Sequence, residues 1–141
     1  MSIANDRRIA LDIDHFVIRV RDIERTAEFY ERVLGAERVA LTYGRGGLRF
    51  GSTQINLHDK GSTPDPIPDV VPAPGGGDVC FRWAGSTDEA LEYLAQNGIE
   101  AILGPVDRMG AAGHGRSVYF RDPDGNLLEL ISYQRSEQTP E

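Results

Sequence analysis

The 141-residue sequence predicts an α+β fold made of two tandem βαβββ modules, and two observations carry that prediction. The first is a break near the middle of the chain, where residues 61–77 hold five prolines followed by three glycines. Prolines at this spacing exclude helix and central strand, so the segment is predicted to be an extended connector. The second is that the order of elements before the break recurs after it.

Residues 12–60 are predicted to form the first module. Residues 13–20 are rich in β-branched and apolar side chains and are expected to be its first strand. A helix is predicted from Asp22, a good N-cap, to Gly35, a natural C-terminal stop, because apolar side chains recur at helical spacing between them. The remaining strands are expected at 37–43, 48–51 and 54–59, with a turn at 44–47.

Residues 78–133 are predicted to form the second module. Its strands are expected at 78–83, 99–103, 117–121 and 126–133, and a helix begins at Ser86 or Thr87 and stops at Gly98. The glycine-rich residues 104–116 are interpreted as a loop that can act as a lid, with His114 on its surface. The ends of the chain, 1–11 and 134–141, are expected to lie outside the fold.

The two modules align with each other without a gap over their first halves. An offset of 63 pairs His15 with Asp78, and it also pairs Tyr30 with Tyr93. Towards the module ends, an offset of 71 pairs His58 with Glu129. This repeat is too long for a solenoid and fits a duplicated module.

Four side chains that can ligate a metal fall at matched positions of the repeat. Strand alternation places them on the sheet face opposite the helices, and they are His15, His58, Asp78 and Glu129. Each alone is more often a solvated surface residue. Together, on modules related by a pseudo-two-fold axis, they can converge on one divalent ion such as Ni, Zn, Mn or Fe(II).

Three further residues lie on the same predicted face. Arg19 and Arg82 occupy equivalent positions in the repeat, where each is expected to contact either an anionic substrate or solvent. Cys80 is more often a small packed side chain than a nucleophile.

Composition narrows the classes of partner and location. The net charge of −7 argues against a nucleic acid partner. The single cysteine excludes an intrachain disulfide and fits a reducing compartment. With no apolar run of membrane-spanning length and no signal peptide at the start, the expected location is cytoplasmic.

Residues 12–133 resemble the vicinal oxygen chelate superfamily of glyoxalase I, fosfomycin resistance proteins, extradiol dioxygenases and bleomycin resistance proteins. The motifs on which this resemblance rests are LDIDHFV at 11–17, FYERVLG at 29–35 and FRDPDGNLLE at 120–129. The stretches LRFG at 48–51 and QINLH at 54–58 are similar to the small glyoxalase domain-containing protein 5-like group. The resemblance implies one domain over residues 1–141, whose sheets curl into a cup with the helices outside.

The resemblance also implies a metal held by the first and last strands of each module, which maps onto His15, His58, Asp78 and Glu129. Better-known members carry a histidine where this chain has Asp78, whereas this chain has one at position 58. The implied activity is a glyoxalase-like lyase or isomerase, with Glu129 moving the proton through a metal-bound enediolate. The alternatives are an Fe(II) dioxygenase, a thiol transferase of the fosfomycin type, and a resistance protein that only binds a small molecule. Family members of this length imply a homodimer.

Overall fold

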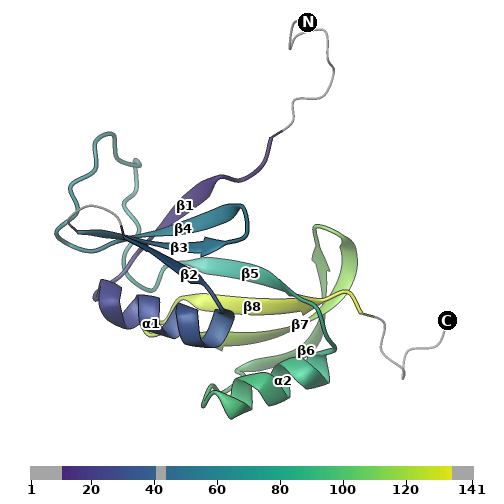
Figure 1. The fold of residues 1–141 in the computed structure, drawn as a ribbon. Helices are drawn as coiled ribbons and strands as arrows, with labels where there is room; N and C mark the ends of the chain where they lie inside the picture. The colour runs from purple at the N-terminus through teal and green to yellow at the C-terminus, as the bar shows by residue number, and fades with distance from the viewer. Residues whose placement is uncertain (1–10, 41–43, 135–141) are drawn as a thin grey trace, which may run out of the picture.

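The computed structural model describes residues 11–40 and 44–134, which form two four-stranded mixed sheets and two helices (Figure 1). The first module consists of β1 (His15–Arg19), α1 (Ile23–Leu34), β2 (Glu37–Ala40), β3 (Arg45–Phe50) and β4 (Thr53–His58). The second consists of β5 (Asp78–Trp83), α2 (Thr87–Gln96), β6 (Leu103–Gly110), β7 (Gly113–Arg121) and β8 (Leu127–Ser132). The α+β class and the two βαβββ modules are therefore confirmed.

Each module has its own sheet with the same strand order. The orders are β1-β4-β3-β2 and β5-β8-β7-β6, and the first pair in each sheet is parallel while the others are antiparallel. Both helices lie on the same side of the molecule, below the sheets in Figure 1. The opposite face of each sheet carries no helix, and the candidate site residues point to that face.

Helix α1 begins and ends where the sequence predicts, whereas α2 begins as predicted but ends at Gln96, with Asn97 as its C-cap, just before the predicted stop at Gly98. The Asp22 side chain accepts a hydrogen bond from the Arg25 backbone N–H at 3.1 Å, and Gly35 ends α1 in the left-handed conformation at φ 67°. Ser86 caps α2 in a capping box, in which the Glu89 carboxylate accepts from the Ser86 backbone N–H.

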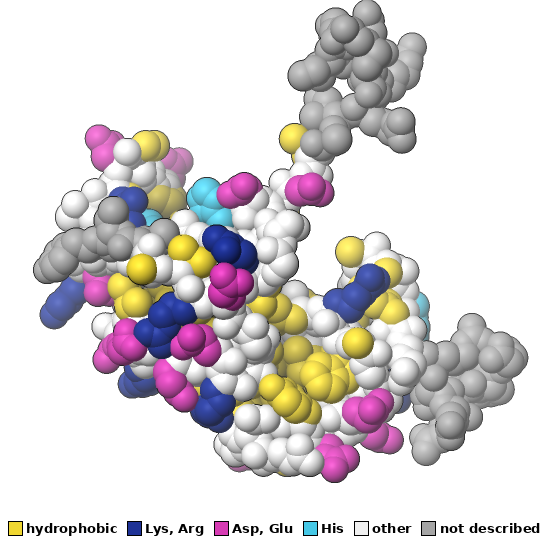
Figure 2. Space-filling model, viewed as in Figure 1, with side chains coloured by type: hydrophobic (Ala, Val, Ile, Leu, Met, Phe, Trp, Pro, Cys, Tyr) yellow, Lys and Arg dark blue, Asp and Glu magenta, His cyan; other side chains and the backbone are white. Residues whose placement is uncertain are grey.

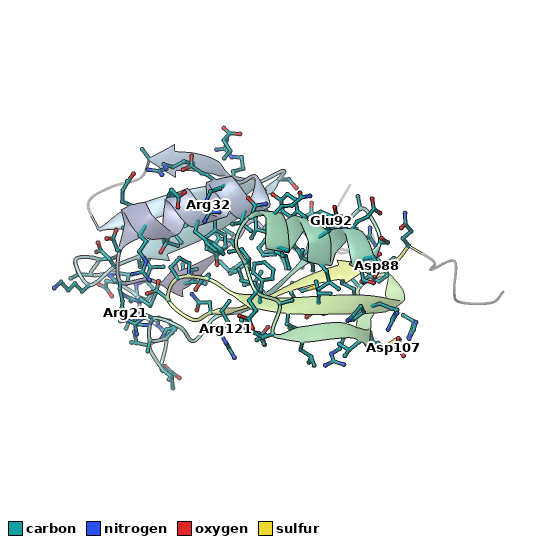
Figure 3. All side chains as sticks on the ribbon, turned by 90° about the horizontal axis from the view of Figure 1, so that it is seen from below. Arg21, Arg32, Asp88, Glu92, Asp107 and Arg121 are labelled. Carbon is teal, nitrogen blue, oxygen red and sulfur yellow. The ribbon has the colours of Figure 1, made fainter. Side chains whose placement is uncertain are left out.

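One hydrophobic core joins the two modules, with buried side chains from both sheets and both helices. Across the junction, the Tyr30 hydroxyl donates to the Asp122 carboxylate at 2.7 Å and the Tyr93 hydroxyl donates to the Val33 carbonyl at 2.6 Å. Figure 3 shows α1 and α2 as neighbours in one layer, with Arg32 turned towards α2, where its guanidinium donates to the Asn97 carbonyl. The modules are thus fixed to each other by packing and by buried polar contacts.

Two predicted irregular segments are strands. The predicted loop 104–116 is wrong, because β6 and β7 form a hairpin through it. Its Gly115 reflects close packing instead of a turn, since a Cβ there would lie 2.9 Å from the Ser132 carbonyl oxygen. The predicted turn 44–47 belongs largely to β3, where a Cβ on Gly46 would lie 2.8 Å from Ile23 of α1.

Other predicted boundaries shift or cannot be compared. Of the predicted strand 99–103, only Leu103 belongs to a strand, at the start of β6. Residues 41–43 of the predicted strand 37–43, and most of both predicted loose ends, lie outside the described residues. Neither of the helices in the described part of the chain has the length and apolarity needed to cross a bilayer.

Candidate functional site

Glu129 lies at the centre of the open face of the second sheet. It stands on β8, opposite Cys80 on the edge strand β5 and opposite Tyr119 on β7. The neighbouring Leu128 and Leu130 point into the core, so strand alternation turns the Glu129 carboxylate to the open face. Asp78, two residues before Cys80 on β5, shares this face.

A cavity of about 410 Å³ adjoins the Glu129 carboxylate. The tip of the β6–β7 hairpin and Ile131 form its apolar wall, and the Arg82 guanidinium lies 4.5 Å from the centre of the Tyr133 ring. The Tyr133 hydroxyl accepts from the Ala112 backbone N–H at 3.3 Å and so connects the hairpin tip to the end of β8. The cavity therefore offers one carboxylate, one cation and an apolar wall to a small molecule.

The groups beside Glu129 keep their protons at neutral pH. Partial burial of the thiol, and next the negative charge of Glu129, raise the pKa of Cys80 to about 12. Burial raises the pKa of Tyr119 as well, with Glu129 adding to the shift, while the Arg108 guanidinium that donates to the Tyr119 hydroxyl at 2.8 Å opposes it. Cys80 is therefore a thiol, not a thiolate nucleophile.

His15 lies on the open face of the first sheet, at the start of the edge strand β1. Its ring is half exposed, and its Nδ1 lies 2.7 Å from the carboxylate of Asp14. An exposed imidazole beside a carboxylate is free to bind a metal through its other nitrogen. Its partner on β4 is Gln54, so the neighbouring strand supplies no histidine or carboxylate at the level of His15.

The predicted equivalence of His58 and Glu129 is wrong by two residues. Glu129 pairs with Cys80, whose repeat-equivalent is Val17, and Val17 pairs with Asn56. Asn56 is therefore the counterpart of Glu129. Leu57 and Leu128 match in type, but a strand shifted by two residues keeps the same faces, so residue type alone does not fix the register.

His58 itself stands opposite Arg19, at the far end of β1 from His15. Four residues of strand separate the two levels, or about 13 Å at the rise of a β-strand. The structure thus separates His58 from His15 along the sheet.

In the part of the chain that the structure describes, no three His, Cys, Asp or Glu side chains come close enough to hold a metal ion. Asp78 and Glu129 share the open face of the second sheet, and their charges both act on Cys80. His15 belongs to the other sheet. The junction places the later part of β1 against the start of β5, since a Cβ on Gly77 would lie 3.3 Å from Ile18. One chain alone therefore presents the predicted donors as two incomplete sets.

Several residues around Glu129 were not predicted from the sequence. Tyr119, Arg108 and Tyr133 all contribute to its surroundings. The signal for Tyr119 was available, because alternation within the predicted strand 117–121 turns it away from the core residue Phe120. Arg108 lay inside the segment interpreted as a loop.

The two βαβββ modules, each with a four-stranded mixed sheet, define the class of α+β proteins built from a duplicated module. The chain belongs to the glyoxalase/bleomycin resistance protein/dioxygenase superfamily, whose family model matches residues 12–130.

The chain is similar to a glyoxalase domain-containing protein, a virulence protein and a lyase. It is 47% identical to the glyoxalase domain-containing protein RDO1 of Mycosarcoma maydis, over 86% of this chain and 68% of that one. It is 42% identical to the virulence protein STM3117 of Salmonella typhimurium, over 86% and 83% of the two chains, and the crystal structure of that protein matches with a TM-score of 0.81. The crystal structure of a lactoylglutathione lyase from Agrobacterium tumefaciens matches with a TM-score of 0.68 at 25% identity, over 89% of this chain and 96% of that one.

Proposed function

We propose that this protein is a divalent-metal-dependent enzyme of the glyoxalase type, acting on a small substrate with two adjacent oxygens, and that two copies of the chain form each site. The observation that carries the proposal is the division of the donors. His15 lies on one open sheet face, while Asp78 and Glu129 lie on the other, and the described part of one chain completes no donor set.

A second copy is the natural source of the missing donors. The strands that carry His15 and Asp78, β1 and β5, are both edge strands of their sheets. Hydrophobic side chains also gather on the surface over β5, between the two helices (Figure 2). In a two-fold dimer, the first sheet of one copy would meet the second sheet of the other. The two-fold axis repeats this contact, so that both copies have their edge strands β1 and β5 covered.

In this dimer His15 from one copy, with Asp78 and Glu129 from the other, would hold the ion. An imidazole and two carboxylates suit Ni, Zn, Mn or Fe(II). When bound there, such an ion would supply Lewis-acid polarisation of a substrate carbonyl oxygen. His58 is outside this donor set, because it stands about 13 Å along the strand from the level of His15.

Glu129 is assigned the proton transfer. Its carboxylate faces the cavity of about 410 Å³, where it can take a proton from a carbon next to a carbonyl and return it. Cys80 and Tyr119 stay protonated beside it, so neither competes with Glu129 as a base. The likeness to a lactoylglutathione lyase structure and to a glyoxalase domain-containing protein supports this reaction class, and the 31% identity to a biphenyl-2,3-diol 1,2-dioxygenase of Rhodococcus globerulus keeps the dioxygenase as its alternative.

Elemental analysis of untagged protein purified without chelator tests the proposal. We expect about one Ni, Zn or Mn per chain in the wild type, loss of that metal in Glu129→Gln, and retention in the matched control His58→Gln. A screen of α-ketoaldehyde–thiol adducts should then show turnover in the wild type and in the control only.

Two other outcomes redirect the assignment. Iron in the wild type, with activity lost in air, favours the dioxygenase alternative and a screen of catechols. No metal in the wild type after soaking in divalent salts contradicts the ligand set, and a small-molecule-binding protein then accounts best for the fold.

A further inference from the structure

A second cavity lies on the open face of the first sheet, away from Glu129. It measures about 350 Å³ and adjoins a cleft of about 460 Å³. The proline-rich segment, which loops away from the first sheet in Figure 1, forms one wall. The residues lining the cavity are Val17, Arg19, His58, Pro64, Pro66, Pro68 and Pro72.

His58 is the polar centre of this cavity. Its side chain is buried, with 7% of the residue exposed, and its Nδ1 has no hydrogen-bond partner among the described residues. A buried polar atom without a partner destabilises the fold, so the His58 ring keeps a hydrogen-bonding capacity that the described protein groups leave unused.

Positive charge surrounds His58. Among the described residues Arg19 forms no ion pair, and the Nε of Arg45 donates to a neutral group, the Ser62 hydroxyl, at 3.1 Å. Both guanidiniums act on His58: after burial, they are the next causes that lower the pKa of its imidazole. In the adjoining cleft, Lys60 adds a further cation. Among the described residues that line this cleft, Asp59 is the one carboxylate. A chain with a net charge of −7 therefore concentrates unneutralised cations at this point.

The opposite wall of the cavity is apolar. Four prolines line it, Val17 adds an apolar side chain two residues before Arg19 on β1, and none of these side chains carries a polar atom. A ligand that fits both walls needs an anionic group at one end and an apolar body at the other.

We propose that this cavity binds a small organic anion, with its carboxylate or phosphonate group held by Arg19 and His58 and its apolar body packed against the prolines. An Arg guanidinium binds such a group with two parallel hydrogen bonds, and a neutral imidazole N–H donates a third. The site is independent of the proposed metal centre, because both anchoring side chains lie about 13 Å along the sheet from the level of His15.

The test measures binding of two anionic probes, phenylacetate and phenylphosphonate, with benzyl alcohol as the uncharged probe of similar shape. Titrations followed by NMR use metal-free protein, so the result does not depend on the metal proposal. We expect one or both anions to bind at least tenfold tighter than benzyl alcohol and to shift the His58 ring signals. Which anion binds tighter identifies the head group, and either preference supports the site.

Variants locate the binding. Arg19→Met should weaken the anion at least tenfold, while Arg121→Met, at an exposed arginine of the second module, should leave it unchanged. His58→Gln, which keeps the size of the side chain, should weaken it less than Arg19→Met does, and it serves as the decisive variant if Arg19→Met does not fold. Equal affinity for benzyl alcohol and the anions, or equal losses in the Arg19 and Arg121 variants, would overturn the proposal.

Discussion

His58 combines a titratable ring with a covered and positively charged position. Burial, and then the charges of Arg45 and Arg19, lower its pKa below the usual value for histidine. The unfolded chain keeps the usual value of about 6.5, so it binds more protons than the folded state as the pH falls below that value. The free energy of unfolding therefore decreases as the pH falls below about 6.5, and His58 does not affect it at higher pH.

We expect this dependence to disappear in His58→Gln. Urea unfolding between about pH 7.5 and pH 5 should show the wild type losing stability relative to the variant as the pH falls, with a constant difference above about pH 7. His114→Gln, at an exposed histidine, should follow the wild type. Parallel profiles for the wild type and His58→Gln would contradict the assigned shift.

Tyr30 forms the buried polar link between the modules. Its ring is fully covered, and its hydroxyl donates at 2.7 Å to Asp122, which also accepts from the backbone N–H groups of Asp124 and Asn126. Burial, followed by the charge of Asp122, raises the pKa of Tyr30, so the hydroxyl remains a donor over the whole accessible pH range.

Tyr30→Phe removes this donor and leaves a buried carboxylate with one partner fewer. We expect a loss of about 1–3 kcal/mol in the free energy of unfolding, measured by urea denaturation. Tyr119→Phe, on the open face, is the matched control and should change stability by less than about 0.5 kcal/mol. Similar losses in both variants would show that the Tyr30 hydroxyl is not a special contact.

At the scale of elements, the capping box of α2 fixes where the second helix begins. The Ser86 hydroxyl accepts from the Glu89 backbone N–H at 3.1 Å, and the same residue's backbone N–H donates to the Glu89 carboxylate at 2.9 Å. Ser86→Ala should lower the free energy of unfolding by about 0.5–2 kcal/mol in a thermal or urea melt. Thr87→Ala, one residue inside the helix, should cost less, and the reverse order would place the cap at Thr87.

The helices were predictable from sequence because their signals are local. Asp22, Gly35 and Ser86 act within one turn of the chain, and each acts as the sequence predicts. The glycines of β3 and β7 were wrongly interpreted as turn and loop residues, because the reason for each glycine is not local. Gly46 and Gly115 are needed because another element approaches closely, and a sequence shows a glycine without showing its distant neighbour.

The candidate site was predictable only in part. Strand alternation correctly placed His15, Asp78 and Glu129 on faces away from the helices. Their position along each strand depends on how β1 pairs with β4 and β5 pairs with β8. The connecting segments between these strands differ in length in the two modules, so the pairing cannot be read from the sequence. For that reason Asn56, and not His58, is the counterpart of Glu129.

At the scale of the whole molecule, the two open faces raise a question that variants can decide. If each site uses His15 from one copy and Glu129 from the other, His15→Ala and Glu129→Gln are defective in different halves of the site. A dimer that contains one copy of each variant has one site with both defects and one site with neither. A site built within a single chain cannot be repaired in this way.

We therefore expect the two variants to complement each other. Each alone should bind no metal, whereas an equimolar mixture, unfolded and refolded together, should recover about one quarter of the wild-type metal content, because about half of the dimers are mixed and half of their sites are intact. Light scattering should give the mass of two chains for the wild type and both variants. A mixture of His15→Ala with itself, refolded in the same way, is the control and should recover none. A dimeric mixture that recovers no metal would place both donors in sites within one chain, and a monomeric mass would remove the shared site altogether.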